Sequence, residues 1–190
     1  MRDLGERRAR RFGHAIADGD SISLVVEVDG ADAARAAESR GAQALVVDGN
    51  IHDVRSATEL PILSTRSSLD DAADSGADAF VVSAHELPRE AADRLADTLA
   101  LGIECVVSVD NDEALKRVLE EHDPEIFLLD GDLERALDLL SDVPVGKLAI
   151  ARAESVTSAE IAELERRGID AVIVPAQIIA ALAGDTRLSG

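Results

Sequence analysis

The sequence predicts an α/β fold, a compact (β/α)8 or TIM barrel with one short extra helix at its N-terminus. Three observations predict it. Eight short apolar segments follow one another along the 190 residues, and charged, helix-like segments separate them. Most of the apolar segments are continuous rather than alternating, as is typical of parallel strands buried on both faces. A short phrase that begins with glycine recurs before several of these segments.

The expected elements alternate regularly along the chain. The expected strands span residues 23–28, 44–47, 61–64, 79–83, 104–108, 126–129, 147–151 and 171–174. Helices are expected at residues 2–17, 31–40, 68–75, 88–100, 112–121, 133–140 and 158–167, and a weaker one at residues 52–58 has room for barely two turns. Asp110 or Asn111 can cap the helix at 112–121, and Thr157 with Glu160 forms a capping box for the helix at 158–167.

The recurring phrase joins the end of a helix to the start of a strand. It reads Gly41-Ala42-Gln43-Ala44 in one copy, Gly76-Ala77-Asp78-Ala79 in a second and Gly168-Ile169-Asp170-Ala171 in a third, and Gly102 begins a looser copy. We expect each glycine to end its helix in the left-handed conformation, in which a side chain would be strained. Such recurrence indicates repeated βα units.

We expect residues 1–190 to form a single domain, with residues 1–18 as the leading helix and residues 22–183 as the barrel. Eight units with short connections favour a closed barrel, and a doubly wound open sheet is the alternative. The first strand-to-helix turn, Val28-Asp29-Gly30-Ala31, is too short for a glycine-rich dinucleotide loop. Because a chain of this length is at the lower size limit of the barrel fold, its loops must be nearly minimal.

Composition argues against several classes of partner. The formal net charge is −19, which opposes binding to nucleic acids and to anionic membranes. No apolar run approaches the about 20 residues that span a bilayer. The N-terminus has no apolar signal segment, and the single cysteine, Cys105, excludes an internal disulfide framework. We therefore expect an acidic cytoplasmic protein.

A site is expected at the carboxyl ends of the strands, where the barrel fold places its active sites. Glu27 is the candidate catalytic residue, and the other candidates at the barrel mouth are Asp29, Asp48, Arg66, Ser108, Asp130 and Arg152. Glu27 ends an apolar run, so an inward-facing carboxylate there would need Arg66 or Arg152 as a partner. Asp48, Asp110 and Asp132 are expected to be helix caps.

The same positions offer little for other kinds of chemistry. His52 and His85 lie near the expected mouth without the spacing of metal ligands, and no nucleophile motif is present. We therefore expect no cofactor and no metal ion. The expected partner is a small molecule at the carboxyl-terminal face of the barrel, and the oligomeric state stays open.

A series of short phrases between Val25 and about Ala183 carries a resemblance to a known family. The phrases are Val26-Glu27-Val28-Asp29, Gly41-Ala42-Gln43-Ala44, Leu60-Pro61-Ile62-Leu63, Ala73-Asp74-Ser75-Gly76-Ala77-Asp78-Ala79, Gly102-Ile103-Glu104-Cys105-Val106-Val107-Ser108-Val109 and Gly168-Ile169-Asp170-Ala171-Val172-Ile173-Val174. In this order they resemble the indole-3-glycerol phosphate synthase family of phosphate-binding barrels. The resemblance implies a lyase of tryptophan biosynthesis, which closes the indole ring of a carboxyphenylamino deoxyribulose phosphate with loss of carbon dioxide and water.

The residues that carry this chemistry in the family are mostly replaced here. The family's first-strand glutamate is retained as Glu27, but Asp29 and Thr65 occupy the places of its two lysines and Ser108 that of its fifth-strand glutamate. The sixth-strand motif is replaced by Leu129-Asp130-Gly131-Asp132. The resemblance therefore implies a divergent, shortened member with weak or absent activity.

The phosphate site that the resemblance implies is also altered. It would lie after the seventh and eighth strands, where Ala151-Arg152-Ala153-Glu154 and Pro175-Ala176 stand in this chain. Glu154 places a carboxylate there, and Pro175 has no N–H group to offer an anion. Two alternatives remain beside the family reaction: a non-catalytic barrel that acts as a scaffold or partner-binding protein, and an enzyme of other chemistry that uses carboxylates and a divalent cation.

Overall fold

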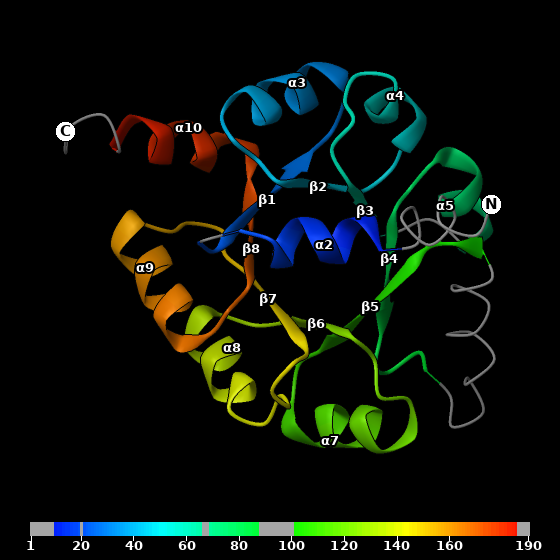
Figure 1. Ribbon diagram of the computed structural model, residues 1–190, viewed down its shortest axis with the longest axis vertical. Coiled ribbons are helices and arrows are strands. Elements are labelled where there is room, and N and C mark those ends of the chain that lie inside the picture. Colours follow the sequence, from blue (N-terminus) through cyan, green and yellow to red (C-terminus); the bar gives the residue numbers. More distant parts are fainter. Residues whose placement is uncertain (1–9, 20, 66–68, 88–100, 186–190) are drawn as a thin grey trace.

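The computed structural model of the protein describes residues 10–19, 21–65, 69–87 and 101–185. Within these residues, eight strands pair in parallel in sequence order, and the last pairs with the first, so the sheet closes into a barrel (Figure 1). The strands are β1 (Ser23–Val28), β2 (Ala44–Val47), β3 (Ile62–Ser64), β4 (Ala79–Ser83), β5 (Glu104–Val109), β6 (Ile126–Leu129), β7 (Leu148–Arg152) and β8 (Ala171–Pro175). The predicted (β/α)8 barrel is confirmed, and an open sheet is excluded.

Helices surround this barrel on the outside (Figure 1). They are α3 (Ala31–Ser39), α4 (Ile51–Arg55), α5 (Leu69–Ser75), α7 (Asp112–Glu121), α8 (Leu133–Leu140), α9 (Ser158–Arg167) and α10 (Ala176–Asp185). The weak second helix is shorter than expected, with five residues in α4. The helix expected at residues 88–100 lies outside the described residues. None of the described helices is long and apolar enough to cross a membrane.

The ends of the elements follow the local signals in the sequence. Gly41, Gly76, Gly102 and Gly168 have φ values of 92°, 89°, 72° and 98°, so the recurring glycines adopt the left-handed conformation as predicted. Thr157 and Glu160 form the expected capping box at the start of α9.

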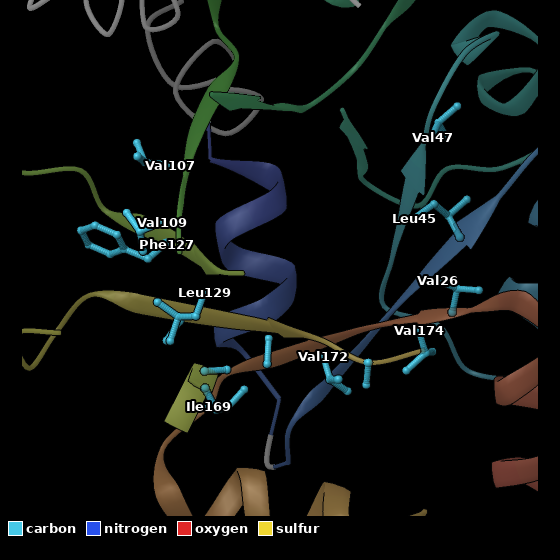
Figure 2. Close-up of a cluster of buried hydrophobic side chains, with 14 of the residues drawn as sticks. Val26, Leu45, Val47, Val107, Val109, Phe127, Leu129, Ile169, Val172 and Val174 are labelled. Atoms are coloured by element: carbon cyan, nitrogen blue, oxygen red, sulfur yellow. The ribbon is translucent and has the colours of Figure 1, made fainter. Parts of the chain in front are cut away.

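Alternate residues of each strand point to opposite sides of the barrel wall. Those that point inward form one buried cluster, which includes Val25, Val46, Leu63, Val106, Leu128, Ile150 and Ile173. The residues between them face the helices and form the larger outer core. Figure 2 shows part of this outer core, with Val26, Phe127 and Val172 among its members. Each short strand therefore needs apolar residues on both faces, which explains the continuous apolar runs of the sequence.

The helix α2 (Arg11–Ala17) closes the barrel at the amino-terminal ends of the strands, and Figure 1 shows it across the middle of the ring. Its Phe12 and Ile16 side chains are fully buried in the inner cluster. The Ser23 hydroxyl, at the start of β1, donates a hydrogen bond to the Ile16 carbonyl at 3.2 Å. A leading helix was expected at residues 2–17, and α2 corresponds to its second half. The first nine residues lie outside the described part of the chain.

Charged side chains anchor α2 beneath the barrel. Glu104, the first residue of β5, accepts hydrogen bonds from the Phe12 and Gly13 N–H groups at 2.7 Å and 3.0 Å. These N–H groups belong to the first turn of the helix, where a carboxylate is favoured. Asp78 is buried just before β4, and it accepts hydrogen bonds from Arg55 at 2.6 Å and from Arg11 at 3.4 Å. The extra helix is therefore part of the barrel core.

The anchor at Glu104 makes stability depend on pH. Burial raises the pKa of the Glu104 carboxyl above its ordinary value, although the hydrogen bonds from Gly13 and Phe12 act in the opposite direction. Between the ordinary and the raised pKa, the native state binds more protons than the unfolded state. The free energy of unfolding should therefore fall as the pH rises through this window. Glu104→Gln keeps an oxygen acceptor for the N–H groups and should remove this decrease.

Urea denaturation between about pH 4 and pH 7, the range above the ordinary carboxyl pKa, measures the effect. The control is Glu120→Gln, which removes an exposed carboxylate of α7. Parallel pH profiles for the wild-type protein and Glu104→Gln would contradict the assigned role of this carboxyl.

Candidate functional site

The inner face of the barrel becomes polar at the carboxyl ends of the strands. Because side chains alternate with a period of two, Glu27 points the same way as Val25, Ser108 the same way as Val106 and Arg152 the same way as Ile150. The same pattern directs Ser83, Asp130 and Pro175 inward. We call the six residues Glu27, Ser83, Ser108, Asp130, Arg152 and Pro175 the mouth.

An ion pair joins two strands of the mouth. Arg152 at the end of β7 donates a hydrogen bond from Nη1 to Oε1 of Glu27 in β1 at 2.8 Å. The two side chains reach past β8, whose Pro175 pairs in register with Glu27. Their exposed fractions are 38% for Arg152 and 36% for Glu27, so the pair is only partly removed from water. The Nε atom of Arg152 is buried and has no hydrogen-bond partner.

This pair confirms the expected partner for Glu27. The sequence predicts Arg66 or Arg152 as that partner, and the structure identifies Arg152. Arg66 lies outside the described residues.

A second polar pair lies on β5 and β6. The Ser108 hydroxyl donates a hydrogen bond to Oδ2 of Asp130, directly after β6. Ser83 of β4 pairs in register with Ser108. Both residues are predicted site candidates, but their contact is not predicted from the sequence. The contact could have been predicted from the alternation of side chains, because Ser108 and Asp130 each lie two residues after an inward-facing residue on neighbouring strands.

A hollow of about 300 Å³ lies beside the mouth, where β8, β1 and β2 end. Its lining residues are Glu27, Val28, Asp29, Val46, Asp48, Pro175, Ala176 and Gln177. The hollow therefore brings together three of the predicted site residues, Glu27, Asp29 and Asp48. The helix α10 begins at its edge with Ala176.

Two of the three expected helix caps are wrong. Asp132 caps α8 as expected, because its carboxylate accepts the Arg135 N–H at 2.9 Å. Asn50, rather than Asp48, accepts the first-turn N–H group in α4. In α7 the cap is Asn111, one of the two residues expected there, and Asp110 is not the cap. The asparagine that caps α4 lies two residues after Asp48, and the asparagine that caps α7 lies one residue after Asp110.

Asp110 instead pairs with a histidine outside the mouth. Its Oδ1 atom lies 3.0 Å from Nε2 of His85, and both side chains are more than half exposed. This hydrogen bond holds the pKa of the Asp110 carboxyl below its ordinary value.

The lysines and aromatic residues of the chain lie away from the mouth. The sequence contains two lysines. Lys116 is exposed on α7, and Lys147 pairs with Asp123 at 3.0 Å just before β7, at the opposite end of the barrel.

Of the three phenylalanines, Phe12 fills the bottom of the barrel, and Phe80 and Phe127 belong to the outer core. Over the described ranges, no three His, Cys, Asp or Glu side chains are grouped so that they could hold a metal ion.

Comparison with known sequences gives one informative similarity. No protein-family model matches the chain. The chain is 27% identical over 165 residues to an indole-3-glycerol phosphate synthase from Geobacillus sp. (strain WCH70), an alignment that covers 74% of this chain and 64% of that protein. The chain thus spans less than two thirds of the length of this relative. The similarity agrees with the resemblance in the sequence phrases.

Comparison with solved structures shows the fold. The barrel is similar to N-acetylmannosamine-6-phosphate 2-epimerase from Clostridium perfringens, with a TM-score of 0.68 and 15% identity over 88% of this chain and 92% of that one. It is also similar to a putative lyase/mutase from Burkholderia cenocepacia J2315, with a TM-score of 0.69 and 17% identity over 98% and 88%. A 2,3-dimethylmalate lyase gives a TM-score of 0.65 and 17% identity over 95% and 85%. At these identities the likeness concerns the fold alone.

The exposure of the Glu27–Arg152 pair predicts a small contribution to stability. A double-mutant cycle with Glu27→Gln, Arg152→Gln and the double variant should give a coupling energy below about 1 kcal/mol, as for other solvent-accessible ion pairs. Urea denaturation of the four proteins measures it. A coupling above about 3 kcal/mol would contradict this description, because that size belongs to fully buried pairs.

Proposed function

We propose that this protein is a divergent relative of indole-3-glycerol phosphate synthase that binds a small molecule at the mouth and has little or no synthase activity. The observation that carries the proposal is the position of the two lysines, Lys116 and Lys147, both remote from the mouth. The mouth lies at the carboxyl ends of the strands, where barrel enzymes bind their substrates. Its polar groups converge beside a hollow, as is typical of small-molecule sites.

The loss of synthase activity follows from the chemistry that the family's lysines supply. In the synthase, lysines serve as acid and as charge stabiliser during ring closure, and Asp29 and Thr65 stand at the corresponding places here. Neither residue can supply an ammonium group. A missing general acid or base typically costs 10²–10⁴-fold in rate. Ser108 in place of a glutamate removes a further carboxylate.

The proposal predicts no turnover of the carboxyphenylamino deoxyribulose phosphate above background. Indole formation is followed by fluorescence with the purified protein, and the Geobacillus synthase serves as the positive control. Turnover by this chain at a rate within about 100-fold of the control would contradict the proposal, since the loss of one acid or base alone typically costs that much.

A lyase-type reaction on another substrate is the second candidate function. The Ser108–Asp130 hydrogen bond favours it, because a hydroxyl that donates to a carboxylate can hold or move a proton at a bound ligand. Lyases and an epimerase are also among the proteins that share the fold. A ligand that binds and then gives new product signals in its NMR spectrum separates this candidate from binding alone.

A further inference from the structure

We propose that the ligand of the mouth is a hydroxyl-rich small molecule, of monosaccharide or polyol size, that carries no phosphate or carboxylate group. This inference rests on the proposed function of the mouth as a binding site and specifies the class of molecule that it takes. Charge, hydrogen-bonding groups and the absence of a stacking surface each support it.

The charges of the mouth disfavour an anionic ligand. Among the mouth residues, Arg152 is the cation, and its guanidinium is already bonded to Glu27 at 2.8 Å. Asp130 adds a second carboxylate to the mouth. Within the six mouth residues, an incoming phosphate would therefore meet a neutral ion pair and one further carboxylate, Asp130, and like charges at an interface reduce affinity strongly.

The backbone around the hollow offers few N–H donors to an anion. Pro175, which lines the hollow, has no N–H group to offer an anion. The N-terminus of α10 borders the same hollow and is the feature that would favour a phosphate. Asp29 and Asp48 line that hollow as well and oppose it. A direct comparison of phosphorylated and unphosphorylated ligands therefore decides which effect is larger.

The polar groups of the mouth suit hydroxyl groups. Glu27 and Asp130 offer carboxylate acceptors, and Ser83 and Ser108 offer hydroxyls that both donate and accept. The Gln177 amide lines the hollow and can also donate or accept. A diol can satisfy donors and acceptors together, whereas an aromatic ring cannot. No phenylalanine lies at the mouth to stack on such a ring, because all three belong to the two cores. A hollow of about 300 Å³ is at the small end of ligand cavities.

Matched pairs of sugars test the inference. The probes are D-ribose with D-ribose 5-phosphate, and D-glucosamine with D-glucosamine 6-phosphate, titrated into the full chain by ligand-observed NMR. We expect the unphosphorylated member of at least one pair to bind at least about tenfold more tightly than its phosphate ester. Equal or tighter binding of the esters would overturn the inference and leave ligand binding at the mouth intact. Binding of no probe would overturn the inference, whereas turnover in the synthase assay would overturn the proposed function.

The Glu27→Gln variant tests the role of the ion pair in this selection. It frees the Arg152 guanidinium, so ribose 5-phosphate should bind at least about tenfold more tightly than to the wild-type protein. The double variant with Arg152→Gln should lose this gain. Glu154→Gln is the matched control, because it removes one exposed carboxylate beside the mouth and leaves the ion pair in place. Thermal unfolding confirms that each variant folds. An equal gain in Glu154→Gln would show a general charge effect and overturn the assigned role of Glu27.

Discussion

The alternation of side chains across one closed wall of strands is the constraint on which the rest of this structure depends. Each strand is three to six residues long, so it provides only one to three inward positions. Apolar residues take the middle of the wall, and α2 fills the bottom with Phe12 and Ile16. Polar inward positions are therefore found at the two ends of the strands: Glu104 and Ser23 bond to α2 at the bottom, and the mouth residues lie at the carboxyl-terminal ends. The mouth is therefore one layer deep, and its chemistry depends on few side chains.

The fold and the central pair of the site could be predicted because their signals are local. A continuous apolar run marks each strand, and a glycine that must be left-handed marks the end of several helices. Glu27 could be identified as a site candidate because a carboxylate directly after Leu24-Val25-Val26 must either face water or pair with a cation. The arginine two strands away supplies that cation.

Other features depend on the register between distant strands, which no single segment encodes. The contact between Ser108 and Asp130 requires β5 and β6 to end at matching heights. The position of α2 beneath the barrel depends on Glu104, whose carboxylate lies 91 residues from Gly13 along the chain. Asp48 and Asp110 have the residue type of a helix cap, but a neighbouring asparagine takes the cap in each case. The residue types alone do not show which of two nearby candidates becomes the helix cap.

The proposed function requires that the mouth, rather than another surface, binds the ligand. Amide chemical shifts of the ¹⁵N-labelled protein, recorded during titration with D-ribose and with inorganic phosphate, test it most directly. Ribose should shift signals at the carboxyl ends of β1, β4, β5, β6, β7 and β8, while phosphate at the same concentration should leave them in place. Shifts confined to the region around α2, or produced by phosphate alone, would contradict it.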